Sequence, residues 1–298
     1  MTTIRRHMDR RALFASGAAA ALLAATGVSA NASPARGGRL RAALSGAKRT
    51  DRFDSTLDHG LFMQVTMVGV VFDTLTEIAA DGTLRGELAT SWNGSPDASV
   101  WTLDLRAGVV FHDGTRFTAD DVLATFELHR DTILSDVLEV SAPSEHRLQV
   151  ILSSGDPDFP YRLSDPRLVV YPGKNLAEAM QEGIGTGLYR VHRFQPGRQL
   201  LARRVESHYK DGLSGWFDEI ELVGLSADAV RAEALRDHYV DVADLTHTAD
   251  LGDLAQLTLL PRENFMTAVV DHRIALPRQI GAKWPLDNLR AAERWWMA

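Results

Sequence analysis

Two neighbouring stretches decide the fold: VVFDTLTEIAADGTLRGELATSW at residues 70–92 and WTLDLRAGVVFHDGTRFTADDVLATFE at residues 101–127. The first predicts two short strands joined by a turn at Asp81-Gly82, because Asp-Gly dipeptides favour tight turns. The second predicts a half-buried strand over residues 100–105, where apolar and polar residues alternate. It then predicts a helix that begins after Thr118, a residue type that caps helix N-termini. Strands and a capped helix therefore follow one another within 60 residues or so.

Composition and charge exclude several functional classes. The chain has 298 residues, a formal net charge of −7 and no cysteine. The acidic balance disfavours a nucleic-acid partner, because an acidic surface repels the phosphate backbone. The absence of cysteine excludes disulfides, a thiol nucleophile, cysteine-bound zinc and a lipid-modified cysteine anchor.

The N-terminus predicts an export signal over residues 1–32. Four arginines precede an apolar segment at residues 12–28, which is too short for a good membrane span. Ala30-Asn31-Ala32 matches the A-x-A cleavage pattern, so we expect cleavage after Ala32 and a periplasmic location. The pair Arg10-Arg11 favours the twin-arginine export route, and an ordinary Sec leader is the alternative.

Hydrophobic periodicity predicts further strands and helices along the chain. Alternation indicates a strand at residues 39–44, and strands are also predicted at residues 76–78, beside the Asp-Gly turn, and at residues 147–152. A helical pattern covers residues 61–74. A second helix is predicted over residues 227–237, with Ser226 as its cap and Val230, Ala234 and Leu235 facing inward.

The sequence contains no residue set that supports an enzyme. No nucleophile elbow, His-Glu-x-x-His motif, phosphate loop or dinucleotide fingerprint is present. The run His112-Asp113-Gly114 is interpreted as a turn, and Asp120-Asp121 as acids at a helix start, since adjacent helical residues point about 100° apart. Two histidines and two aspartates offer imidazole and carboxylate ligands for nickel, copper or zinc: His238, Asp241, His247 and Asp250. The alternative interpretation is that these four are solvent-exposed polar residues at a helix end and in the following loop, and no metal site is expected.

The order of these motifs resembles the extracytoplasmic solute-binding proteins of the peptide/nickel class, family 5, which serve ABC importers. The resemblance covers roughly residues 39–298. The residues that carry it are Phe72-Asp73-Thr74-Leu75, Asp81-Gly82, Glu87 to Trp92, Leu105 to Gly114, Thr118 to Val122 and Gly183 to Val191. Gly86 and Leu188 stand where the family pattern usually has proline.

The resemblance implies an α/β fold of the periplasmic-binding-protein type II class, a mixed sheet with flanking helices. It implies that residues 33–298 form mainly lobe I, with the lobe II segment missing near residues 261–284. The implied function is the periplasmic solute-binding component of an ABC importer for peptides or similar solutes, with an inner-membrane ABC permease as partner. A repurposed lobe that acts as a protein-interaction module and a nickel-type metal-binding protein are the alternatives.

The resemblance also indicates where a ligand would bind. In this family the ligand lies between the lobes, and lobe I contacts it through the loop after the first strand and through the hinge. On this chain those positions are Ser45, Gly46, Ala47, His59, Phe62, Met63 and Thr186. Loop packing is the alternative for each of them. No catalytic residue and no cofactor is expected.

Overall fold

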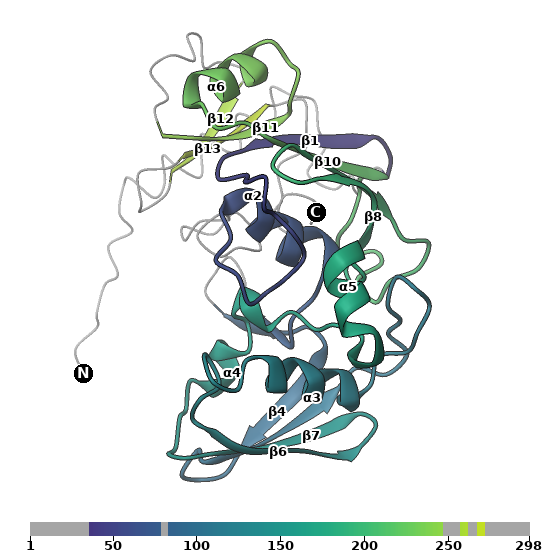
Figure 1. Ribbon diagram of the computed structural model, residues 1–298, viewed down its shortest axis with the longest axis vertical. Helices are drawn as coiled ribbons and strands as arrows, with labels where there is room; N and C mark the ends of the chain where they lie inside the picture. The colour runs from purple at the N-terminus through teal and green to yellow at the C-terminus, as the bar shows by residue number, and fades with distance from the viewer. Residues whose placement is uncertain (1–35, 79–82, 247–256, 262–266, 272–298) are drawn as a thin grey trace, which may run out of the picture. The chain divides into compact units, whose positions relative to one another are not determined.

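A seven-stranded mixed sheet is the largest sheet of the computed structural model, which describes residues 36–78, 83–246, 257–261 and 267–271 (Figure 1). The strand order is β12-β13-β11-β1-β10-β9-β8. β1 lies between two parallel neighbours, β10 and β11, and the other pairs are antiparallel. The strands are β1 (Arg39–Leu44), β8 (Tyr189–Gln195), β9 (Gln199–Arg204), β10 (Glu219–Gly224), β11 (Val242–Leu245), β12 (Leu257–Pro261) and β13 (Thr267–Asp271).

One face of this sheet packs on a helical segment that follows β1. The segment consists of α2 (Leu61–Gln64) and a π-helix, η1 (Val65–Val71), and every residue of η1 is buried. Apolar side chains of β1, β9 and β10 on this face share a core with the segment. The predicted helix over residues 61–74 is confirmed as far as Val71. It ends there because Phe72 is extended, with φ −123° and ψ 158°.

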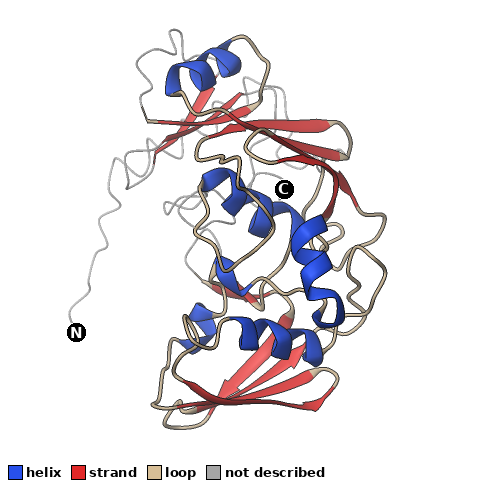
Figure 2. Cartoon of the chain, viewed as in Figure 1, coloured by secondary structure: helices blue, strands red, loops and turns tan. Residues whose placement is uncertain are grey.

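A second, smaller sheet with a helix packed on it follows in the chain (Figure 2). This four-stranded antiparallel sheet has the order β4-β5-β7-β6 and packs with α3 (Ala119–Leu128) around a second core. Its strands are β4 (Ala89–Gly94), β5 (Val100–Leu105), β6 (Val137–Ser144) and β7 (Arg147–Leu152). A two-stranded ribbon, β2 (Thr76–Ile78) with β3 (Leu84–Gly86), precedes them. The strands predicted at residues 76–78, 100–105 and 147–152 are thus confirmed.

The predicted start of α3 is confirmed, and Thr118 and Asp121 form a capping box there. The Thr118 amide donates to Asp121 Oδ2 at 2.8 Å, so the aspartate side chain reaches back to the cap residue. The other Asp121 oxygen accepts from the Gly173 amide at 2.8 Å. Four short helices follow this sheet in the chain: α4 (Phe159–Arg162), η2 (Pro166–Leu168), η3 (Gly173–Asn175) and α5 (Leu176–Glu182).

The last described helix, α6 (Asp228–Arg236), covers β11 and part of β1 on the opposite face of the large sheet (Figure 1). Its existence and the inward position of Ala234 and Leu235 are confirmed, but the cap and the inward position of Val230 were predicted wrongly. The cap residue is Ala227, which makes no side-chain cap bond. Val230 is 46% exposed, whereas Arg231 is buried. The arginine faces inward because carbonyl and carboxylate oxygens at the strand ends satisfy its guanidinium.

Several expectations fall outside the described residues. They are the export signal at residues 1–32, the turn at Asp81-Gly82, and most of the segment 261–284. None of the helices in the described ranges has the length and apolar character needed to cross a bilayer.

Candidate ligand-binding site

The carboxyl ends of β1, β10 and β11 meet at one edge of the large sheet, because the three strands are parallel. In open α/β sheets, ligands bind outside the carboxyl ends of parallel strands where the chain leaves in opposite directions. β1 occupies such a position, since the chain returns to β10 on one side and crosses through α6 to β11 on the other. The loop that leaves β1 begins with the predicted ligand residues Ser45, Gly46 and Ala47.

Ser45 is held by a buried carboxylate on β11. Its amide donates to Asp244 Oδ1 at 2.8 Å, and its hydroxyl donates to Asp244 Oδ2 at 2.6 Å. The Asp244 side chain is fully buried. Burial raises the pKa of Asp244, while the Ser45 hydrogen bonds and the charge of Arg231 oppose that rise. Asp244 of the neighbouring strand β11 therefore fixes the position of Ser45, the first residue of the loop.

Arg231, on α6, supports this arrangement. Its Nε donates to the Asp244 carbonyl at 2.7 Å and lies 3.5 Å from Asp244 Oδ1. Its Nη1 donates to the carbonyls of Leu225 at 2.7 Å and Ser226 at 2.9 Å. One guanidinium thus ties the end of β11 to the loop that leaves β10. The sequence analysis missed this residue because a basic residue on a short helix ordinarily faces solvent.

Gly46 and Gly60 bring two backbones together. The Phe62 amide donates to the Ser45 carbonyl at 3.0 Å. A Cβ on Gly60 would lie 2.1 Å from the Gly46 carbonyl oxygen, which is closer than real contacts allow. Gly46 itself has φ +77°, a conformation that favours glycine. The loop after β1 and the start of α2 are therefore in direct backbone contact.

Replacing Gly60 with alanine is expected to destabilise this crossing by about 1–3 kcal/mol, the usual range for an overpacked site. The cost is steric, because Gly60 has φ −74°, which alanine adopts without strain. Urea unfolding measures the change. The matched variant is Gly173→Ala, whose added methyl would come no closer than 3.0 Å to Ala124 Cβ. Equal stability of the Gly60→Ala variant and the wild-type protein would contradict the close approach.

The remaining predicted residues divide into two groups. His59 is partly buried, and its Nε2 lies 2.7 Å from the Asp54 carbonyl oxygen. It lines an open hollow of about 280 Å³ together with Lys48, Asp51 and Asp58. Phe62 and Met63 have no exposed surface, and both belong to the first core. Their contact with a ligand stays a prediction, as it does for Ser45, Gly46, Ala47 and His59.

Thr186 lies in a different place, a buried polar cluster around Asp73. Its hydroxyl donates to Asp73 Oδ2 at 2.9 Å. Lys210 Nζ lies 3.1 Å from Asp73 Oδ1 and 2.5 Å from Glu87 Oε2. The Tyr209 hydroxyl donates to the same Glu87 oxygen at 2.6 Å. Burial opposes ionisation of Asp73, but the charges and hydrogen bonds of Lys210 and His208 together outweigh it and hold the pKa of Asp73 below its usual range.

Two histidines connect this cluster to neighbouring turns. His208 Nε2 lies 2.8 Å from the Thr186 carbonyl oxygen, and His112 Nε2 lies 2.8 Å from the Gly187 carbonyl oxygen. The His112 amide donates to the Gly185 carbonyl at 2.9 Å. The interpretation of residues 112–114 as a turn agrees with the bond from the Thr115 amide to Asp113 Oδ1 at 2.9 Å. The cluster joins the turn after β5, at residues 112–115, to the segment that leads into β8.

The buried histidines predict a loss of stability in mild acid. Burial lowers the pKa of His112 and of His129. Near pH 6.5 these histidines therefore bind protons in the unfolded chain but stay neutral in the folded chain. The free energy of unfolding falls as pH decreases through and below that value. Each histidine contributes at most about 1.4 kcal/mol per pH unit.

Urea unfolding between pH 5 and pH 8, a range that spans the ordinary histidine pKa of about 6.5, measures this effect. His112→Gln is expected to flatten the pH dependence of stability, because glutamine does not titrate in this range. The glutamine amide can still donate to the Gly187 carbonyl, so the fold should be kept. His192→Gln, on the exposed part of β8, is the control and should leave the profile unchanged. A profile that does not change in His112→Gln would show that His112 does not cause it.

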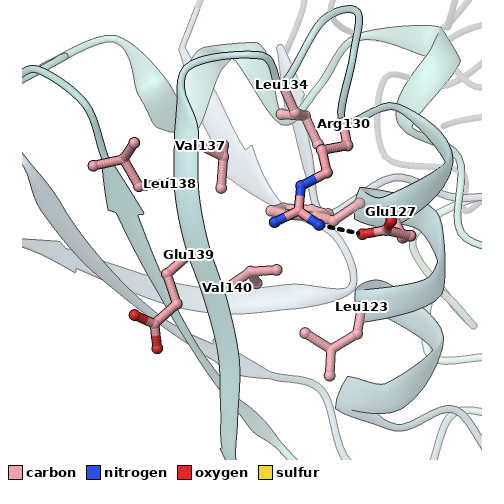
Figure 3. A pocket seen from close by; sticks show the side chains of 9 residues that line it. Leu123, Glu127, Arg130, Leu134, Val137, Leu138, Glu139 and Val140 are labelled. Carbon is pink, nitrogen blue, oxygen red and sulfur yellow. Dashed lines mark hydrogen bonds and ion pairs between the residues drawn. The ribbon is translucent and has the colours of Figure 1, made fainter.

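A second hollow, of about 330 Å³, lies between α3 and β6 (Figure 3). Leu123, Leu134, Val137 and Val140 line it, and Arg130 pairs with Glu127 on the helix at 3.1 Å. None of the predicted ligand residues lines this hollow.

No group of three or more histidine, aspartate or glutamate side chains is arranged to hold a metal ion within the described ranges. His238 and Asp241 lie within them, whereas His247 and Asp250 do not.

Comparison with protein families gives one match over most of the chain. The model described as bacterial extracellular solute-binding proteins, family 5 Middle, matches residues 83–279. The probable D,D-dipeptide-binding periplasmic protein DdpA of Escherichia coli (strain K12) is 28% identical over 189 residues, which are 58% of this chain and 36% of that protein. Di/tripeptide-binding protein 1 of Pseudomonas aeruginosa (strain UCBPP-PA14) is 28% identical over 253 residues, 71% of this chain and 43% of that protein.

Solved structures show the same architecture. The periplasmic binding protein AgaA from A. tumefaciens R10, in complex with agropinic acid, superposes with a TM-score of 0.67 at 26% identity. The match covers 75% of this chain and 48% of that one. The chain thus spans less than half the length of each of these three proteins. The expected fold, that of the type II periplasmic binding proteins, is confirmed.

Proposed function

Because this chain belongs to the bacterial extracellular solute-binding proteins of family 5, we propose that it captures a peptide or a similar small solute in the periplasm and delivers it to an ABC permease. The main support is the loop of residues 45–47, which Asp244 and Gly60 hold at the carboxyl ends of three parallel strands. Such an edge is where open α/β sheets bind ligands. The named ligands of two relatives, dipeptides and tripeptides, support a peptide, and agropinic acid extends the class to other small solutes.

The proposed role is binding and delivery, without catalysis. A solute would lie against the backbone of the loop after β1, with His59 beside it. A second surface would then close over the solute, because enclosure buries more ligand surface and strengthens binding. Residues 1–32 would act as the export signal, by the twin-arginine route, with cleavage after Ala32. N-terminal sequencing of the protein recovered from the periplasm tests that part.

Native mass spectrometry of the full protein from periplasmic extracts tests the function. A co-purified mass in the range of a short peptide is expected, and addition of a dipeptide mixture should raise the melting temperature of the stripped protein, since a ligand that binds only the folded state stabilises it. His59→Ala should reduce this shift, and His192→Ala, on exposed β8, should not. A clean protein that no peptide stabilises would contradict the proposed function. An unchanged rise in melting temperature in His59→Ala would show that the solute binds elsewhere on the protein, and it would leave the proposed function standing.

A further inference from the structure

The outer face of the large sheet is only partly covered by the described helices. α6 packs on Ala43, Ala243 and Leu245, at the β11 side of this face (Figure 1). The same face continues over β10, β9 and β8, where side chains are half-buried or exposed. We call this continuation, with the adjoining part of β1, the arginine face. It carries the exposed side chains of Arg39, Arg190, Arg193 and Arg203 and the half-buried side chains of Arg41, Glu219 and Glu221.

Strand register places these side chains in rows. Arg190 lies opposite Arg203, Arg203 lies opposite Glu219, and Glu219 lies beside Arg39. Directly opposed residues in a sheet share a face. This row therefore contains three arginines and one glutamate across four strands. The next row contains Arg193, Leu201, Glu221 and Arg41 in the same order of strands.

Both glutamates form ion pairs with arginines of this face, namely Arg39 and Arg203. Glu219 Oε2 lies 2.6 Å from Arg39 Nη2, and Glu219 Oε1 lies 3.1 Å from Arg203 Nε. Glu221 Oε2 lies 3.0 Å from Arg39 Nη1. Among the residues that the structure describes, no carboxylate lies within ion-pair distance of Arg190 or Arg193. Asp218 borders the face at the Arg39 end, beside a hollow of about 480 Å³.

The opposed pair Arg190 and Arg203 is itself unfavourable in an isolated sheet. Like charges directly opposite one another destabilise a strand pair. The repulsion disappears when an anion lies between the two guanidiniums. A cationic face on a chain whose net charge is −7 also departs from the rest of the molecule. Both observations point to an anionic partner.

We propose that the arginine face is a docking surface for a protein partner that presents clustered aspartate and glutamate side chains. Arginine suits this role, because its planar guanidinium binds a carboxylate through two parallel hydrogen bonds and is enriched at protein interfaces. Glu219 and Glu221 favour a protein over a continuous polyanion. A membrane surface or a nucleic acid would bring negative charge against both of them, whereas a folded partner can place its carboxylates over Arg190 and Arg193 alone. This role is separate from solute binding at the strand ends.

A fluorescein-labelled peptide with pairs of glutamates separated by serine spacers is the probe, and the same peptide with glutamine in place of each glutamate is the neutral control. The wild-type protein should bind the first in low salt and not the second. Arg190→Glu combined with Arg193→Glu should weaken binding at least about tenfold, because the two guanidiniums without intramolecular carboxylate partners are lost and replaced by negative charge. Arg116→Glu combined with Arg130→Glu, on exposed residues elsewhere, makes the same change in net charge and should leave the affinity unchanged within about twofold.

Stability separates a lost surface from a lost fold. Arg190→Glu places a carboxylate opposite Arg203, so the double variant should unfold no more easily than the wild-type protein. Arg190→Gln combined with Arg193→Gln is the milder second variant and should weaken binding in the same direction. The proposal is overturned by absent binding or by an equal loss in both double variants. It is also overturned if phosphatidylglycerol vesicles, duplex DNA or a second copy of the protein bind through these two arginines instead of the peptide.

Discussion

Replacing Lys210 with methionine is expected to lower the free energy of unfolding by about 3–5 kcal/mol, the usual cost of removing one partner from a buried ion pair. Lys210 Nζ lies 3.1 Å from Asp73 Oδ1 and 2.5 Å from Glu87 Oε2, and both carboxylates are almost fully buried. Without the ammonium, two acidic groups share a site from which water is excluded. Urea unfolding by circular dichroism at neutral pH measures the loss.

Two further variants define the cause of this effect. Lys210→Met combined with Glu87→Gln removes one of the two orphaned charges and should recover part of the stability. Arg203→Met breaks the exposed pair with Glu219 and should cost at most about 1 kcal/mol. If Lys210→Met and Arg203→Met prove equally mild, the cluster around Asp73 does not contribute to stability as its geometry indicates.

Replacing Arg231 with methionine is expected to have an effect of similar size, about 3–5 kcal/mol. The change leaves the fully buried Asp244 without its cation, and it leaves the carbonyls of Leu225 and Ser226 without their donor. Asp244 then binds a proton more readily, since burial already raises its pKa. A protonated Asp244 is a weaker acceptor for the Ser45 amide and hydroxyl, so the loop after β1 should loosen.

Hydrogen exchange distinguishes this local effect from general destabilisation. The Ser45 amide should exchange faster in Arg231→Met, even under conditions where most of the protein stays folded. Arg236→Met is the control, because Arg236 is exposed on the same helix and, among the described residues, pairs only at long range, with Glu233 at 4.0 Å and Asp237 at 3.5 Å. Unchanged protection of Ser45 in Arg231→Met would show that the arginine does not position the ligand loop.

The strands and helices were largely predictable, because their signals are local. Alternation over residues 39–44 and 100–105 follows from one buried face per strand, and both strands lie where the pattern predicted them. Thr118 and Asp121 lie three residues apart, and their capping bond depends on that spacing alone. The motif order also indicated the family, and the family match confirms it.

The burial of Arg231 on α6, in place of Val230, was not predictable from local signals. The helical pattern placed Val230 inward, because an apolar residue gains from burial. The structure places Arg231 inward instead, since Asp244 and the carbonyl ends of two strands supply acceptors that no sequence window contains. An arginine is buried only when its donors are satisfied, and the groups that satisfy it come from other elements.

The sequence by itself determined the fold class, the family, the order of the strands along the chain and the loop after β1 as the ligand candidate. The strands follow from hydrophobic periodicity and turn residues, which act over a few residues, whereas the fold class, the family and the ligand candidate follow from the family resemblance that the motif order carries. Only the tertiary structure decided which charges meet. Lys210 pairs with Asp73 across 137 residues of sequence, and Ser45 bonds Asp244 across 199. The arginine rows likewise depend on the register of four strands. Electrostatic partners are chosen by proximity in space and by exclusion of water, and neither quantity is encoded within a local window.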